Sequence, residues 1–206
     1  MQALRPVRRV AELGSLAAIA PLMTSQEFDQ LFDAEVVRHL SPLGFRPRGK
    51  NGKTLDLLDG ITLVSLLRLG GRLSLPGSAV WTLCFRHTFL RELNELKTVV
   101  GVTGMFTEHY PFKFTPSELM ERRRELRYHS DLNWDYDRFT YESLSPVEVR
   151  RDLSSLAGFI ADQFVPWARS ISPTAAREQL RKFGSQRWDE KIWIEDYDQH
   201  IQSNGG

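Results

Sequence analysis

The sequence predicts a single α+β domain in which an antiparallel sheet of about four strands packs against helices. Three observations lead to this prediction: an amphipathic helix pattern after residue 24, three strand patterns joined by tight-turn residues, and further helix patterns that begin with capping signals. A chain of 206 residues that is 41% hydrophobic can bury one sizeable core, so we expect one domain.

The first helix is predicted from its cap and its apolar spacing. Thr24 and Glu27 form a capping-box pattern, in which each side chain bonds a backbone N–H of the other end. Apolar residues then recur at three- and four-residue intervals, at Phe28, Leu31, Phe32, Val36, Leu40 and Leu43. Pro42 and Gly44 predict the end of this helix.

Three strands are predicted next. Residues 54–58 and 61–69 are apolar and partly β-branched, and Asp59-Gly60 between them is a tight-turn dipeptide typical of hairpins. A third strand spans 80–86, where apolar and polar side chains alternate: Trp81, Leu83 and Phe85 against Thr82, Cys84 and Arg86.

The remainder of the chain is predicted mainly as helices. Residues 90–100 are expected to form a short helix, and 101–114 a loop whose aromatic side chains pack under the domain, namely Phe106, Tyr110, Phe112 and Phe114. Capping boxes begin helices at Thr115 and Ser145, the second running to about Trp167 with Pro166 kinking or ending it. A last short helix is expected from Ser172 to near Gly184.

We divide the chain into a leader at 1–23 that is flexible or partly helical, an α+β core at 24–171, and a C-terminal helix with an acidic, aromatic tail at 172–206. The apolar run in the leader is interrupted by Glu12 and is too short to span a membrane. The single cysteine, Cys84, excludes an intrachain disulfide and a cysteine-based zinc site. We expect a cytoplasmic protein without membrane association.

A cationic turn follows the first helix. The formal net charge of +1 does not indicate a nucleic-acid or membrane partner for the chain as a whole, so any electrostatic attraction must come from a local cluster of charges. Four cations, Arg46, Arg48, Lys50 and Lys53, form a candidate anion site there, and Gly44, Gly49 and Gly52 lend the backbone freedom. The spacing does not match a P-loop, and a solvated connection between helix and strand is the other interpretation.

A second candidate site lies between residues 128 and 137. As a strand, this stretch places aromatic residues on one face and metal-ligand types on the other, at His129, Asp131, Asp135 and Asp137. The same stretch resembles a calcium-binding loop, but Tyr136 stands where the sharp turn needs glycine. A metal site and a row of solvated side chains both remain open.

The tail is the third candidate. Trp188, Trp193 and Tyr197 stand among acidic residues that include Asp196, a combination that suits recognition of a basic protein surface. The alternative is that the tail packs back on its own domain. The sequence has no H-E-x-x-H pair, nucleophile elbow or dinucleotide-binding glycine pattern, so we assign no catalytic residue and no cofactor.

Residues 26–171 resemble a bacterial domain of unknown function, family 4304. The segments that carry the likeness are "HLSPLGFRPRGK", "ITLVSLLRL" and "WTLCFRHTF", followed by "RRRELRYHSDLNWDY" and "LSSLAGFIADQFVPWARSI". The resemblance implies an α+β fold in a small intracellular bacterial protein, sometimes encoded near toxin-neutralising genes, and it implies no enzymatic activity.

These patterns favour a non-enzymatic, intracellular bacterial module that acts by protein recognition, with immunity-like toxin neutralisation as a specific form. The first alternative is a metal-dependent enzyme or metal-binding protein that uses the 129–137 face. The second alternative is a nucleic-acid binder that uses the cationic turn at 46–53, whose affinity would fall steeply with salt.

Overall fold

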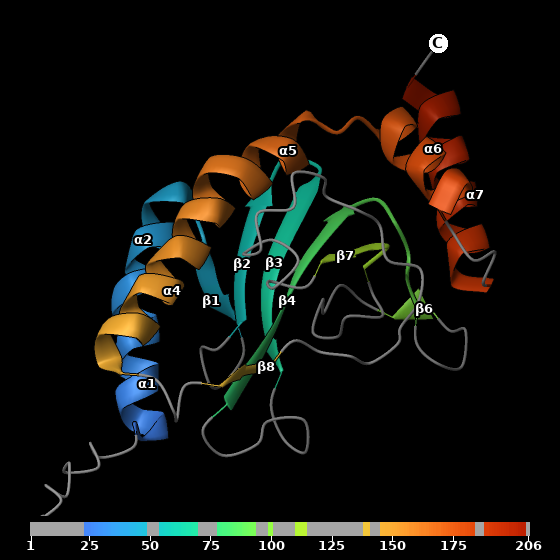
Figure 1. The fold of residues 1–206 in the computed structure, drawn as a ribbon. Coiled ribbons are helices and arrows are strands. Elements are labelled where there is room, and N and C mark those ends of the chain that lie inside the picture. The colour runs from blue at the N-terminus through green and yellow to red at the C-terminus, as the bar shows by residue number, and fades with distance from the viewer. Residues whose placement is uncertain are drawn as a thin grey trace, which may run out of the picture.

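A computed structural model describes residues 23–48, 54–69, 78–93, 99–100, 110–114, 138–140, 145–183 and 188–204. Figure 1 shows an antiparallel sheet with helices along one of its faces and a further helical pair beyond the end of the sheet. The predicted α+β fold class is confirmed.

The first helical segment begins and ends as predicted. It consists of α1 (Ser25–Phe32), a wider π-type turn (Asp33–Val37), α2 (Arg38–Leu40) and a 3-10 turn (Ser41–Leu43). The Thr24–Glu27 capping box is present, with both reciprocal hydrogen bonds. Gly44 ends the segment with a left-handed backbone (φ 102°) and turns the chain into the sheet.

The sheet has the strand order β1 (Arg46–Arg48), β2 (Thr54–Asp59), β3 (Thr62–Leu69), β4 (Ser78–His87) and β7 (Phe112–Phe114), and β8 (Arg138–Thr140) also pairs with β4. All of these pairs are antiparallel. The predicted hairpin and third strand are confirmed as β2, β3 and β4. The additional strands have three residues each, too few to show a hydrophobic period in the sequence.

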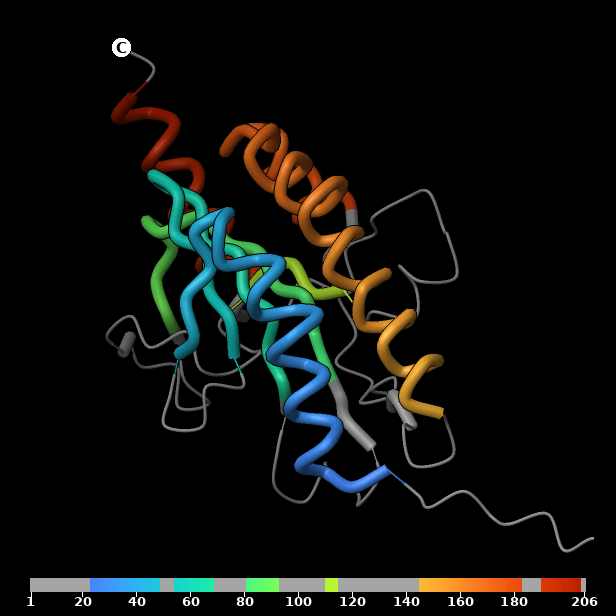
Figure 2. Tube along the Cα trace, turned by 90° about the vertical axis from the view of Figure 1, so that its left-hand side faces the viewer, coloured from blue at the N-terminus to red at the C-terminus, as the bar shows by residue number. Residues whose placement is uncertain are grey.

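One face of the sheet, the helical face, carries the main core. The first helical segment packs there with α4 (Pro146–Phe159) and α5 (Val165–Ser170), and Figures 1 and 2 show α1 and α4 side by side. Phe28 and Phe32 lie over Trp81 with ring centroids 5.8 Å apart in both pairs. The strands contribute alternating buried residues: Leu55, Leu57, Val64, Leu66, Trp81, Leu83, Phe85, Phe112 and Phe114.

The opposite face, which we call the second face, carries the other residues of the same strands. Asp56 pairs with Ser65, and Ser65 pairs with Cys84, so these three side chains point to this face. A smaller buried cluster lies here, formed by Leu63, Leu67, Cys84 and Tyr110. The period-two alternation of strand side chains therefore separates an aromatic core from a face that mixes polar and apolar groups.

The helix predicted over 90–100 is wrong. The described residues of this stretch form β5 (Glu92–Leu93) and β6 (Val99–Val100), which pair with each other antiparallel. Glu92 is buried in an ion pair with Arg86, at 3.2 Å between the closest nitrogen and oxygen. The Arg86–Glu92 contact and the pairing of β5 with β6 stabilise an extended chain here, and together they outweigh the local helix propensity on which the prediction depended.

The loop predicted over 101–114 is also wrong at its end, because Phe112–Phe114 forms β7. The predicted burial of aromatic residues is confirmed for Tyr110, Phe112 and Phe114, whereas Phe106 lies outside the described residues. The helix predicted from Thr115 and the strand predicted over 128–137 also lie outside them.

The C-terminal helices follow their capping signals. α4 begins at a complete Ser145–Glu148 capping box, and a π-type turn at Ile160–Phe164 joins it to α5. Pro166 does not end the helix. Its nitrogen has no N–H to donate to the preceding turn, and the wider π-type turn directly before it accommodates the missing hydrogen bond. α6 (Pro173–Phe183) matches the predicted last helix, and α7 (Trp188–Asn204) is a helix where only a tail was expected.

Among the described residues, none of the helices has the length and apolar character that crossing a bilayer requires.

Replacing Gly44 by alanine tests the turn from helix to sheet. The Cβ would lie 3.1 Å from a Leu57 methyl group and would sit on a left-handed backbone, so we expect a loss of about 1 to 2 kcal/mol in the free energy of unfolding. Gly158→Ala is the control, because its helical Cβ meets no atom within 4 Å and should stabilise by about 0.5 to 1 kcal/mol. Urea unfolding of both variants measures the difference, and equal effects would contradict it.

Candidate functional site

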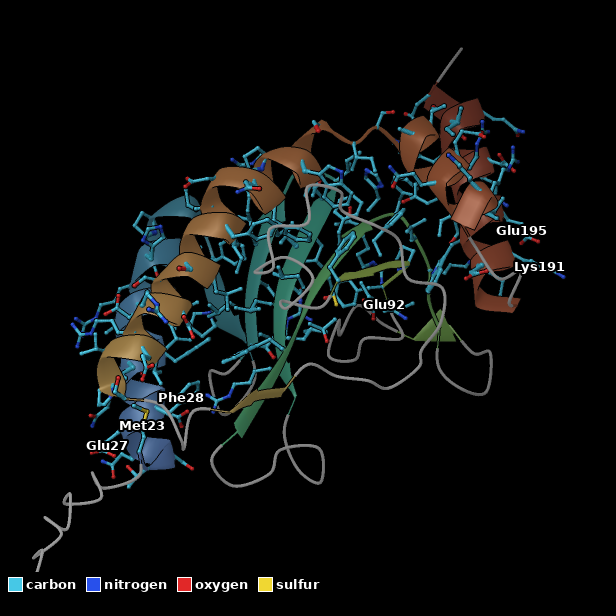
Figure 3. All side chains as sticks on the ribbon, viewed as in Figure 1. Met23, Glu27, Phe28, Glu92, Lys191 and Glu195 are labelled. Atoms are coloured by element: carbon cyan, nitrogen blue, oxygen red, sulfur yellow. The ribbon has the colours of Figure 1, made fainter. Side chains whose placement is uncertain are left out.

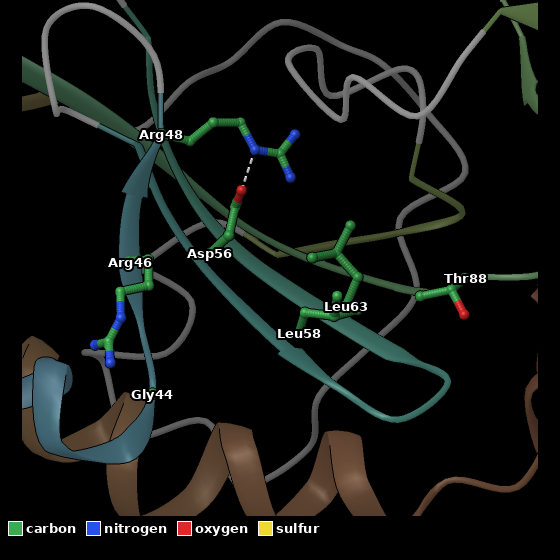
Figure 4. Close-up of a pocket in the computed structure, with 7 residues that line it drawn as sticks. All are labelled: Gly44, Arg46, Arg48, Asp56, Leu58, Leu63 and Thr88. Carbon is green, nitrogen blue, oxygen red and sulfur yellow. Dashed lines mark ion pairs between the residues drawn. The ribbon is translucent and has the colours of Figure 1, made fainter.

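A cavity of about 530 Å³ opens where β1, β2 and β3 meet the end of the first helical segment. Its volume lies in the usual range for ligand sites, roughly 300 to 1,000 Å³. Figure 4 shows the residues that line it: Gly44, Arg46, Arg48, Asp56, Leu58, Leu63 and Thr88.

Strand register places these side chains in two rows on the second face. Arg46 lies opposite Asp56, and Asp56 lies opposite Ser65, which makes a polar row across β1, β2 and β3. Two residues further along, Leu58 lies opposite Leu63 and makes an apolar row beside it. The cavity therefore has a charged side and an apolar side.

The charged side is held by a network centred on Asp56. Arg48 forms an ion pair with the Asp56 carboxylate. The Ser65 hydroxyl donates to the same carboxylate at 2.6 Å and lies 2.6 Å from the Tyr110 hydroxyl. Burial raises the pKa of Asp56, while the bonds from Ser65 and Arg48 act in the opposite direction. The network fixes Asp56 and Arg48 together at one end of the cavity.

Below this network the groups are too buried to react with a ligand. Ser65, Tyr110 and Cys84 are all fully buried. Burial also raises the pKa of the Tyr110 hydroxyl and of the Cys84 thiol, so both stay protonated near neutral pH. A thiolate nucleophile is therefore disfavoured at Cys84, and these residues support the floor of the cavity.

Arg46 is held in a different way at the other end of the cavity. Its Nη1 donates to the backbone oxygens of Ser41 at 3.2 Å and Phe45 at 3.0 Å, at the C-terminus of the first helical segment, where carbonyl groups attract cations. Within the described residues Arg46 has no ion pair, and its Nε and Nη2 make no hydrogen bond. Figure 4 shows it extending toward Gly44, away from the Arg48–Asp56 pair.

Two of the four residues of the predicted anion site are thus brought to one cavity, and they differ in environment. Arg48 is paired with Asp56, while the exposed Arg46 is braced by backbone oxygens. Lys50 and Lys53 lie outside the described residues, in the connection between Arg48 and Thr54.

Three of the tail residues predicted to bind a partner instead pack against, or bond to, other residues of the same chain. Trp193 and Tyr197 belong to the main core, with 1% and 0% of their surface exposed. Asp196 accepts from the Arg91 backbone N–H at 2.8 Å and from its Nε at 2.6 Å, and the Trp193 indole donates to the Arg91 backbone oxygen at 3.0 Å. The partner-binding prediction is therefore corrected for these three residues, because burial removes them from a partner's reach. Trp188 is the first residue of α7.

The outer side of α7 carries a different set of side chains. Figure 3 shows Lys191 and Glu195 on the side of α7 that faces away from the sheet, and both are exposed. The acidic, aromatic composition of the tail therefore divides into an inner aromatic side that docks on the domain and an outer charged side.

His87 links β4 to α7. Its Nδ1 lies 2.9 Å from the Tyr197 hydroxyl, and its ring packs edge-on against that of Tyr197. Burial lowers the pKa of His87 to about 4, a backbone bond with Ile171 acts against this shift, and His200 adds to it. The neutral imidazole is therefore the form that joins these two elements.

The predicted metal face, His129, Asp131, Asp135 and Asp137, lies outside the described residues. In the part of the chain that is described, no three His, Cys, Asp or Glu side chains gather closely enough to hold a metal ion.

Sequence reasoning did not identify Asp56, Leu58, Leu63 and Thr88 as site residues. One signal was present, because Asp56 interrupts the apolar stretch "TLDLLDG" at a position that shares a face with Leu58. Thr88 carries no such signal, since its place at this corner follows from the β3–β4 pairing that ends at His87 and from its backbone bond to Ile61, at 2.8 Å.

Comparisons with family models, with curated proteins and with solved structures gave no match. The resemblance to family 4304 stays a prediction.

Titration of His87 predicts how stability depends on pH. Its pKa of about 4 in the folded chain is below the ordinary 6.5, so the unfolded chain binds more protons between these values and stability falls as pH falls through that window. From pH 7 to pH 5 the loss due to His87 should be about 2 kcal/mol. Urea unfolding of the native chain and of His87→Gln at both pH values measures it. An equal pH dependence in the two proteins would contradict the assignment.

Proposed function

We propose that this chain is a binding module that recognises a protein partner, and that the partner docks over the cavity between β1, β2 and β3. The observation that carries the proposal is an exposed apolar pair beside the cavity. Leu58 and Ile61 have 67% and 44% of their surface exposed, on either side of the Asp59-Gly60 turn. Apolar residues clustered at a rim of charged groups are typical of protein interaction sites.

The charges of the cavity favour an acidic partner. Arg46 and Arg48 contribute two positive charges, and Asp56 contributes one negative charge that is already paired. Electrostatic complementarity therefore supports a partner segment that carries a carboxylate next to an apolar side chain.

Docking on the face of the sheet is favoured over docking on its edge. β1 is the outer strand of the described sheet, and Pro47 is its middle residue. Proline has no N–H to give to an added strand, and its presence in an edge strand is a common way to prevent strand addition. Side chains on the second face, rather than backbone groups of β1, supply the specificity in this proposal.

Toxin neutralisation inside a bacterial cell is the specific form of this proposal, and its support is the family resemblance. The described residues offer no observation that favours the metal-dependent alternative. For the nucleic-acid alternative, Arg48 is already paired with Asp56, and Lys50 and Lys53 lie outside the described residues.

The experiment is a capture assay with tagged protein in a lysate of the organism that encodes it. We expect the native chain to capture an acidic protein and the double variant Leu58→Ser, Ile61→Ser to lose at least about tenfold of that capture, because the apolar contact is removed. Addition of salt should weaken the capture as well, since the contact includes charges.

Val147→Ser is the matched control. Val147 is 77% exposed at the start of α4, on the helix that covers the other face of the sheet, so its replacement removes an exposed apolar side chain away from the cavity. Capture that resists the double variant, or that falls equally in Val147→Ser, would overturn docking at the cavity.

A further inference from the structure

We propose that His87 is a pH-sensitive switch, whose protonation releases α6 and α7 together from the sheet and uncovers the inner side of α7. We call these two helices the C-terminal pair. The inference goes beyond the proposed function and does not depend on it, because it concerns the end of β4, where the C-terminal pair docks.

The C-terminal pair is built as one unit. Arg177 and Arg181 of α6 both form ion pairs with Asp198 of α7, at 2.8 Å and 3.0 Å. Figure 1 shows the two helices packed together beyond the end of the sheet and joined to α5 by an extended connection. That connection is Ile171 and Ser172, and Ile171 has an extended backbone (φ −77°, ψ 113°). The pair can therefore leave the sheet without losing its internal contacts.

His87 holds this connection and α7 at the same time. Its Nδ1 lies 2.9 Å from the Tyr197 hydroxyl, and a backbone hydrogen bond joins its ring to Ile171. Burial raises the pKa of the Tyr197 hydroxyl, so this hydroxyl keeps its proton and donates it to the neutral Nδ1. One buried imidazole thus joins β4 to both ends of the C-terminal pair.

Ring contacts continue from His87 to the next turn of α7. Phe89 stacks on the ring of His87, with centroids 5.3 Å apart, and on the ring of His200, with centroids 3.8 Å apart. Tyr197 packs edge-on against both His87 and Phe89. The docking surface at the end of β4 therefore depends on how the His87 ring is placed.

Protonation of His87 opposes docking in two ways. A protonated Nδ1 carries a hydrogen of its own and no longer accepts from the Tyr197 hydroxyl. The new positive charge also lies in a buried position, since 1% of the His87 surface is exposed. Burial of a charge without a partner costs free energy, and release of the C-terminal pair lets water solvate it.

The charged groups around His87 do not offset its proton. The segments that meet there carry Arg86 on β4, Arg91 and Glu92 after it, and Asp196 and His200 on α7. Glu92 is paired with Arg86 at 3.2 Å, and Asp196 is paired with Arg91 at 2.6 Å. On β3, the residue opposite His87 is the uncharged Thr62. Both carboxylates are thus already bound to arginines.

The direction of the pH effect follows from the two states of the ring. Burial lowers the pKa of His87 to about 4 in the docked chain, while a solvated ring has the ordinary 6.5. The released state binds more protons between these values, so docking is strongest above pH 6.5 and weakens as the pH falls toward 4. From pH 7 to pH 5 the released fraction should rise about twentyfold.

Release changes which side chains another molecule can reach. Trp193 and Tyr197 are buried in the docked chain, and the Asp196 carboxylate is bound by Arg91. Once the C-terminal pair is free, these three residues form an aromatic, acidic surface on α7. Acid pH therefore uncovers a surface that the chain covers at neutral pH.

The test is native-state hydrogen exchange, followed by NMR on the full chain at pH 7 and pH 5. Each rate is divided by the intrinsic rate at that pH, which gives a protection factor. Amides of α6 and α7 should share one protection factor that is lower than those of β3 and β4, because release precedes global unfolding. That shared value should fall about twentyfold from pH 7 to pH 5.

Three variants assign the effect. His87→Gln should reduce the fall between the two pH values to less than about threefold, because the titrating group is gone. His39→Gln is the matched control, since it makes the same change at an exposed histidine on α2 and should keep the full fall. Tyr197→Phe keeps the ring and removes the hydroxyl, so it should raise the released fraction at pH 7 about fivefold.

Three results would overturn the inference. Equal protection of α7 and β4 would mean that the helices leave only when the whole chain unfolds. An undiminished fall in His87→Gln would assign the effect to another group. Unchanged α7 protection in Tyr197→Phe would remove the hydrogen bond from the switch, and this variant decides the matter if His87→Gln does not fold.

Discussion

The pairing of β2 with β3 around the turn at Gly60 is the constraint on which the rest of the structure depends. It places Leu57 opposite Val64 toward the helices and Asp56 opposite Ser65 toward the second face. A slip of one residue would reverse every side chain, which would bury Asp56 among aromatic rings and expose the leucines. The main core and the cavity are therefore two consequences of one register.

The second anchor is the segment that leaves β4. Arg86 is buried with Glu92, and burial lowers the pKa of the Arg86 guanidinium while Glu92 acts against that shift. The adjoining His87 contacts Tyr197 of α7, and Thr88 bonds to Ile61 of the hairpin. Three consecutive residues thus join a buried ion pair, the C-terminal helix and the rim of the cavity, so the position of α7 and the shape of the cavity share one support.

Local signals in the sequence predicted the elements whose ends they mark. The Thr24 and Ser145 caps and the Asp59-Gly60 turn led to correct helices and a correct hairpin, because each depends on residues a few positions apart. The 90–100 segment was predicted wrongly, because its extended form depends on the pairing of β5 with β6 and on the buried Arg86–Glu92 ion pair, and the local pattern of residues shows neither. The site shows the same limit: Arg46 and Arg48 were recognised as cations, but their different environments depend on the Asp56 side chain, which pairs with Arg48, and on the backbone oxygens that bond Arg46.

The tail shows why composition alone does not predict which side chains a partner could meet. Aromatic and acidic residues together favour a basic partner only if both kinds of side chain are exposed. In α7 the aromatic side chains of Trp193 and Tyr197 are buried in the core. The Asp196 carboxylate is likewise buried, and it accepts a hydrogen bond from Arg91. Because Trp193, Tyr197 and Asp196 hold α7 on the domain, the proposed contact depends instead on Leu58 and Ile61. These two exposed apolar residues lie beside the cavity that Arg46 and Arg48 line. The charge expected of a partner is then negative, the reverse of what the tail alone indicates, because burial decides which charges another molecule can meet.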